Sequence, residues 1–93
     1  MVVGMMKIAL WAGHARSLKD KRQVVRSVKD RVKAKFNASV AEVEDQDLWQ
    51  RITLGVTVVA ADAAHADSQI QSILSFITSI ADVAEVSTEL VSR

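Results

Sequence analysis

The sequence contains no cysteine, so it can form neither a disulfide framework nor a thiolate zinc site. It has no proline, only three glycines and 4% aromatic residues, and no stretch of it resembles a linker. No apolar run reaches the ~20 residues that span a bilayer, and the opening MVVGMMKIALW lacks the basic start of a secretory signal. We therefore expect no membrane association and a reducing, cytoplasmic location.

Hydrophobic residues make up 49% of the chain and charged residues 25%, which are ordinary values for a globular protein. We assign residues 1–93 to a single domain, because domains run from about 50 to 250 residues. The net charge of +1 conceals an uneven distribution. Residues 16–35 hold nine basic and two acidic residues, a net charge of +7, and the rest of the chain holds three basic and nine acidic residues, a net charge of −6. This asymmetry suggests a polyanionic partner.

Hydrophobic periodicity divides the chain into alternating stretches typical of strands and stretches with the three- and four-residue spacing typical of helices. The predicted elements are a strand at Val2–Trp11, a helix from Ser17 to a left-handed cap at Asn37, strands at Ser39–Glu44 and Trp49–Ala60, a helix capped by Asp62 with an apolar stripe ending at Ile80, and an edge strand at Val83–Val91. Ser17 and Asp20 have the spacing of a capping box. This order predicts an α+β, ferredoxin-like βαββαβ sandwich, a four-stranded antiparallel sheet with two helices on one face.

The first predicted helix carries a row of basic residues. At about 100° per residue, five of them fall within ~80° of one another beside the apolar stripe, where they would attract phosphates. The predicted RNA- or phosphate-binding residues are Arg16, Lys19, Arg22, Arg26, Lys29 and Lys33. A solvated helix that packs one apolar stripe against a sheet produces the same pattern, so both interpretations stay open.

The sheet face without helices would expose apolar side chains in a monomer, and large exposed patches usually mark interfaces. The predicted interface residues of a homodimer are Val3, Met5, Trp11, Trp49, Arg51 and Val59, and Val83 is expected on the same face. Strand parity places Trp11, Trp49 and Arg51 close together. The two tryptophans would either stack with RNA bases or serve a packing role, in a dimer interface or in holding the hairpin, and the packing interpretation is favoured.

No catalytic constellation is visible. The two histidines, His14 and His65, are expected at opposite ends of the sheet, beyond hydrogen-bond reach of each other. The acidic residues between 42 and 47 lack the ligand spacing and central glycine of a calcium loop. We therefore predict no catalytic residues, no metal and no cofactor.

Four segments together resemble the YlxP-like family of small bacterial proteins of unknown function. They are MVVG at the start, SLKDKR at Ser17–Arg22, FNASVAEV at Phe36–Val43 and QDLWQR at Gln46–Arg51. The resemblance implies a ferredoxin-like fold and no known activity, and members are often encoded beside translation initiation and ribosome-binding factors. The leading hypothesis is a non-enzymatic accessory protein that binds RNA or the ribosome through its first helix. The alternatives are a homodimeric interaction module that uses the open sheet face and, by fold analogy alone, a small-ligand regulatory domain.

Overall fold

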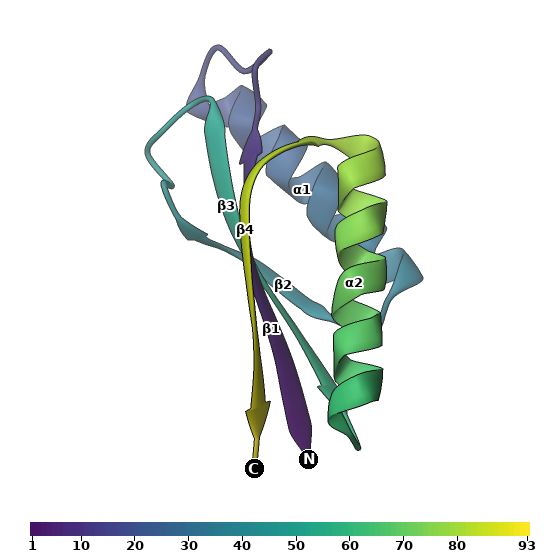
Figure 1. Ribbon diagram of the computed structural model, residues 1–93. Helices are drawn as coiled ribbons and strands as arrows, with labels where there is room; N and C mark the ends of the chain where they lie inside the picture. The colour runs from purple at the N-terminus through teal and green to yellow at the C-terminus, as the bar shows by residue number, and fades with distance from the viewer.

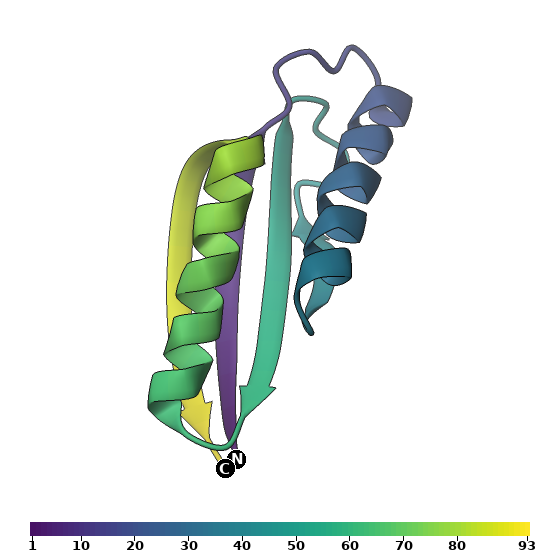
Figure 2. The same ribbon diagram turned by 90° about the vertical axis from the view of Figure 1, so that its right-hand side faces the viewer.

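The computed structural model describes residues 1–93, which form four strands and two helices. The elements are β1 (Val2–Trp11), α1 (Leu18–Lys35), β2 (Ser39–Glu44), β3 (Arg51–Ala60), α2 (Ala63–Ile80) and β4 (Asp82–Ser92). The strands make one sheet in the order β2-β3-β1-β4 with every neighbouring pair antiparallel. Figures 1 and 2 show both helices on the same side of this sheet, with α1 over the β2 side and α2 over the β4 side. The predicted ferredoxin-like fold is confirmed.

The core lies between the sheet and the helices, and strand alternation determines which side chains enter it. Even-numbered positions of β1 and β3 face the helices, and their registered neighbours alternate in the same way. The most deeply buried side chains of the core include Ile8, Leu10, Ile52, Leu54, Val56, Val32, Ile70, Ile73 and Ile77. The apolar stripes of both helices and the alternation of both central strands therefore meet in one layer.

Both helices begin where their capping residues predict. The Ser17 hydroxyl accepts a hydrogen bond from the Asp20 backbone N–H at 3.1 Å, and the Asp62 carboxylate caps α2 by accepting from the His65 N–H at 2.8 Å. The Asp20 carboxylate in turn accepts a hydrogen bond from the Arg16 backbone N–H at 3.1 Å, which makes the contact at the start of α1 reciprocal.

The expected left-handed cap at Asn37 is wrong. Helix α1 ends at Lys35, and its capping residue Phe36 is extended, with φ −130°. The chain enters β2 almost directly, and the Phe36 ring packs edge-on against Phe76 of α2 with 5.8 Å between centroids. The extended conformation of Phe36 thus accompanies an aromatic contact with α2, and no left-handed residue ends the helix.

A bulge in the β1–β4 pairing changes the position of Val83. Ala9 lies opposite Glu85 whereas Leu10 lies opposite Val83, so β4 contains one additional residue at this point. Val83 therefore faces the helices and packs against the core, and its expected place on the uncovered face is wrong. Strand β3 also begins two residues later than predicted, which leaves Trp49 in the β2–β3 turn.

Candidate nucleic-acid interface and the uncovered sheet face

Five basic side chains follow one flank of α1, and we call them the basic row. The row comprises Lys19, Arg22, Arg26, Lys29 and Lys33. Four of the five are exposed and Lys29 is half-buried. No member forms an ion pair, and neither does the exposed Arg16 that precedes the helix. The ion pairs of this structure involve Lys7, Lys21 and Arg51 instead. The charge of the row is therefore not neutralised within the chain.

The other flank of α1 faces α2 and carries the remaining basic residues of its second half. The Arg31 guanidinium lies 5.9 Å from the Phe76 ring centroid, and the Lys35 ammonium lies 4.7 Å from the same centroid. These cation–π contacts hold two cations in the groove between the helices. Because helix positions advance by about 100° each, the basic row points away from α2.

Lys21 belongs to the same basic segment, but its side chain is only 1% exposed. Its ammonium lies 2.8 Å from a Glu42 carboxylate oxygen and donates to the backbone carbonyl of Asp45. The contact with Glu42 is an ion pair outside hydrogen-bond geometry, since that oxygen has no hydrogen-bond partner. Lys21 therefore anchors α1 to β2 and to the β2–β3 turn. The sequence feature that could have indicated its burial is its position in the apolar stripe of the helix, between Leu18 and Val25.

The structure brings Trp11 and Arg51 together, as strand parity predicts. They are registered neighbours, and the guanidinium lies 5.4 Å from the Trp11 ring centroid. The Arg51 Nε lies 3.3 Å from the Asp45 carboxylate and its Nη2 lies 3.4 Å from Glu85. Asp45, the one residue with a positive φ (60°), also accepts a 2.7 Å hydrogen bond from the Thr53 hydroxyl. Arg51 is thus neutralised, and its role is to order this end of the sheet.

Trp11 and Trp49 line one shallow hollow beside Arg51, with Leu48 completing its apolar wall. Trp11 is 51% exposed and Trp49 is 54% exposed. We call Trp11, Leu48 and Trp49 the tryptophan end of the sheet. These three large side chains present exposed apolar area at the end of β1 and on the β2–β3 turn.

The remainder of the uncovered face is less apolar than its sequence suggests. Val3 and Met5 are half-buried and Val59, opposite Val3, is exposed near the other end of the strands. Between the two ends, Lys7 pairs with Glu44 at 2.9 Å, and the Arg51 ion pairs cover the adjoining area. Val3 and Trp11 are eight residues apart on β1, about 27 Å at ~3.4 Å per residue. The predicted interface residues therefore form two separate apolar groups with a charged centre.

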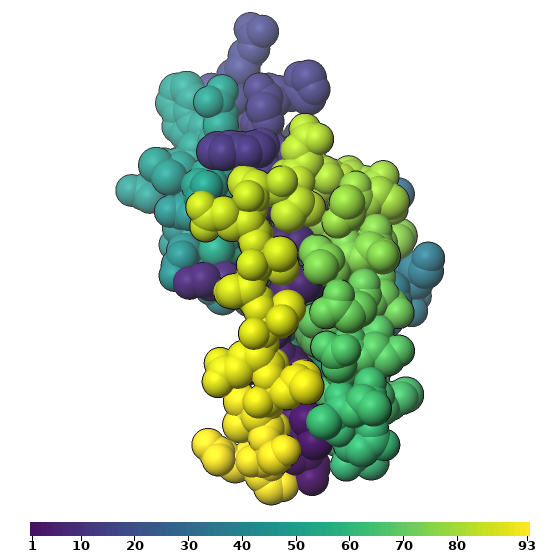
Figure 3. Space-filling view, in the orientation of Figure 1, coloured from purple at the N-terminus to yellow at the C-terminus, as the bar shows by residue number.

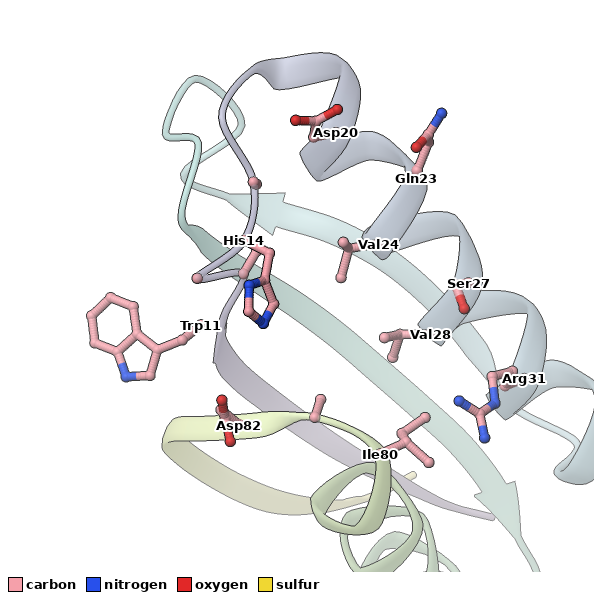
Figure 4. A pocket seen from close by; sticks show the side chains of 14 residues that line it. Trp11, His14, Asp20, Gln23, Val24, Ser27, Val28, Arg31, Ile80 and Asp82 are labelled. Atoms are coloured by element: carbon pink, nitrogen blue, oxygen red, sulfur yellow. The ribbon is translucent and has the colours of Figure 1, made fainter.

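A hollow of about 530 Å³ opens between α1, the loop after β1 and the start of β4. Figure 4 shows His14, Val24, Val28 and Ile80 around it, while Trp11 projects away. Its volume suits a small molecule. The start of α2, whose first turn contains His65, lies at the opposite end of the molecule from this loop (Figure 1), so the hollow contains one histidine without the other.

The acidic and histidine side chains form no cluster of three that could hold a metal ion. Neither helix is long and apolar enough to cross a membrane. The two buried polar residues, Lys21 and Thr53, both donate hydrogen bonds to Asp45.

Comparison with known proteins supports both the fold and the family resemblance. A family model described as "Protein of unknown function (DUF503)" matches residues 3–90. The "Uncharacterized protein YlxP" of Bacillus subtilis (strain 168) is 36% identical over 74 residues, which are 80% of this chain and 80% of that protein.

Among solved structures, a de novo designed protein with a ferredoxin fold superimposes with a TM-score of 0.53 at 16% identity, over 100% of this chain and 87% of the design. A dimeric ferredoxin-like protein of unknown function from Thermobifida fusca aligns with a TM-score of 0.43 at 14% identity, over 98% and 92% of the two chains. The likeness to the design concerns the fold alone. Since the family match spans nearly the whole chain and the YlxP relative covers four fifths of it, the chain belongs to the DUF503 family of proteins of unknown function, as its resemblance to YlxP indicates.

Proposed function

We propose that this protein is a non-enzymatic accessory protein that binds RNA by holding the phosphate backbone along the basic row. The observation that carries the proposal is the uncompensated charge of that row on one exposed flank of α1, in a molecule whose other segments are net acidic. Phosphate contacts position a protein on nucleic acid but carry no base information. We therefore expect affinity with little sequence preference.

The geometry of the row supports several simultaneous phosphate contacts. Lys19 and Lys33 are fourteen residues apart, which corresponds to about 21 Å along a helix at ~1.5 Å per residue. Five contacts to single-stranded RNA give a slope of roughly −3.5 in log affinity against log salt. Raising the salt from about 50 to about 200 mM should then weaken binding by roughly a hundredfold.

The test is fluorescence anisotropy with a labelled single-stranded RNA and a labelled RNA stem-loop. Neutralising three neighbouring members of the row, Arg22→Gln, Arg26→Gln and Lys29→Gln, should weaken binding by more than about tenfold and make the salt slope shallower by about two. Because the three side chains lie outside the core and form no ion pair, far-UV circular dichroism and the thermal midpoint should stay close to those of the wild type.

The matched control changes the net charge by the same amount at another place. Ser68, Ser72 and Ser75 are exposed positions of α2, and replacing all three with glutamate also lowers the net charge by three. The proposal expects this variant to keep most of the affinity. Equal losses in the two variants would mean that only overall charge matters, and an absence of wild-type binding at low salt would refute the proposal.

A second candidate function is a protein-interaction module that uses the tryptophan end. The observation in its favour is the half-exposed state of Trp11 and Trp49 side by side, since such apolar side chains are enriched at the centres of interfaces. Because the centre of the uncovered face is charged, a contact at this end is favoured over a homodimer that buries the whole face. Size-exclusion mass measurements of wild type, Trp11→Ala and Trp49→Ala at two salt concentrations test it. A species that is monomeric in all three proteins removes self-association through this face.

A further inference from the structure

Strand β4 forms an open edge of the sheet along its entire length. It pairs with β1 on one side, from Trp11 opposite Asp82 to Val2 opposite Ser92, and has no strand on the other. The Arg93 N–H continues this ladder by donating to the Met1 carbonyl at 2.9 Å. Figure 3 faces this edge and shows the β4 side chains as an uncovered column from the start of the strand to its end.

This edge has two of the devices by which proteins prevent strands from pairing, a bulge at its start and the charges of Glu85 and Glu89, but it lacks proline and basic side chains. The chain has no proline, and residues 82–92 contain neither lysine nor arginine. The bulge lies at the beginning of β4, so the eight residues from Glu85 to Ser92 are regularly paired and extended. An edge of this length can accept a further strand.

The helix-side positions of this regular part contain two apolar residues that α2 does not cover. Val86 lies opposite the buried Ile8 and Leu90 lies opposite Gly4, yet Val86 is 44% exposed and Leu90 is 42% exposed. The apolar layer of the sheet therefore continues beyond α2 to the open edge. A strand added there would cover both side chains.

A second copy of β4 fits this edge in one antiparallel register. A two-fold axis at Thr88 places Val86 opposite Leu90 of the other copy, and Ser87 opposite the other Glu89. Moving the axis to Ser87 sets Glu85 directly against the other Glu89, which is destabilising. An axis at Glu89 sets that carboxylate against itself, and an axis at Val86 brings the bulge into the pairing. Only the first register joins the two apolar residues and separates the acidic ones.

We propose that two copies of this chain associate through β4, antiparallel and centred on Thr88, to form one continuous eight-stranded sheet. The two-fold axis is perpendicular to the sheet, so both helix layers lie on the same side and the contact is closed and isologous. This interface is independent of the RNA proposal and leaves both basic rows and both uncovered faces exposed.

The first test is the molar mass of wild-type protein by analytical ultracentrifugation over a range of protein and salt concentrations. The dimer fraction should rise with salt, because Glu85 and Glu89 of one copy lie diagonally from those of the other and salt screens their repulsion. RNA binding should fall with salt, so the two proposals fail separately. A monomer at all concentrations overturns the dimer, and a dimer that dissociates as salt rises contradicts this register.

Cysteine trapping tests the register directly, because the natural chain has no cysteine. In a Thr88→Cys variant the two sulfur-bearing residues face each other across the axis, with Cα atoms about 4.5 or 5.5 Å apart, within disulfide range. Mild oxidation should convert this variant to a covalent dimer. Ser87→Cys, whose partner is displaced by two residues, and the exposed Ser72→Cys of α2 should cross-link much more slowly. Faster cross-linking of Ser87→Cys would overturn the register.

Charged substitutions at the edge provide a test that needs no oxidation. Val86→Lys and Leu90→Lys should each lower the association constant by about tenfold or more, because each buries an ammonium against an apolar partner. Val59→Lys introduces the same charge at an exposed position of β3 and should leave the dimer intact. Dissociation by Trp11→Ala with an unchanged Val86→Lys dimer would assign self-association to the uncovered face instead.

Discussion

Replacing Lys21 with methionine isolates the contribution of the buried cation, because methionine keeps most of the aliphatic volume. The change leaves the Glu42 carboxylate without its cation and the Asp45 carbonyl without its donor. Removal of one partner of a fully buried ion pair costs about 3–5 kcal/mol. The Glu42 side chain keeps 18% exposure, so water partly solvates the abandoned carboxylate and we expect the lower limit, about 3 kcal/mol.

Urea unfolding followed by circular dichroism measures this loss. With a slope of about 1.5 kcal/mol per molar urea, the midpoint should fall by roughly 2 M at unchanged slope. The control is Lys33→Met, an exposed change on the same helix outside any ion pair, which should move the free energy of unfolding by less than about 0.5 kcal/mol. The double variant Lys21→Met/Glu42→Leu should recover most of the stability, since an apolar pair replaces an ionic one. If Lys21→Met is as stable as Lys33→Met, the anchoring role of Lys21 is refuted.

Three further stability predictions follow from single contacts. Gly4→Ala should lower the free energy of unfolding by about 1–3 kcal/mol, because the added Cβ would lie 2.9 Å from Ile70 Cγ1. Gly13→Ala, whose Cβ would have no atom within 4 Å, should be nearly neutral. Equal thermal midpoints for the two variants would contradict this packing. Ser17→Ala removes the cap of α1 and should cost about 1 kcal/mol in urea unfolding, and a fully retained midpoint would mean that the cap contributes nothing. Thr53→Val leaves the carboxylate of the β2–β3 turn without its hydroxyl donor and should cost about 1–2 kcal/mol, read from the same transition.

The elements of this fold are encoded in short stretches of sequence and could be predicted from them. The alternation of β1, the apolar spacing of both helices and the caps at Ser17 and Asp62 are each decided by residues within one or two turns. The prediction at Asn37 was wrong because the end of this helix is not decided by neighbouring residues alone. The end of α1 depends on the packing of Phe36 against Phe76, which is forty residues away in the chain.

The charged residues show the same division. Sequence identified the basic row, because five cations at helical spacing need no other element to share a flank. Lys21 was not among the predicted binding residues, but its burial was not predicted either, since burial of that ammonium requires a carboxylate and a carbonyl supplied by another strand and its turn. The two ion pairs that neutralise Arg51 likewise come from the β2–β3 turn and from β4.

The sequence by itself determined the order of the elements, the face that each apolar stripe buries and the segregation of positive charge to one helix, because these properties depend on spacing along the chain. The tertiary structure alone decided which cations are left without an ion pair and where ion pairs interrupt the uncovered face. It also placed the bulge that turns Val83 toward the helices and leaves the rest of β4 as a regular open edge. The physical reason is that an ion pair or a strand register is a contact between distant segments, and its geometry exists only after those segments have packed together.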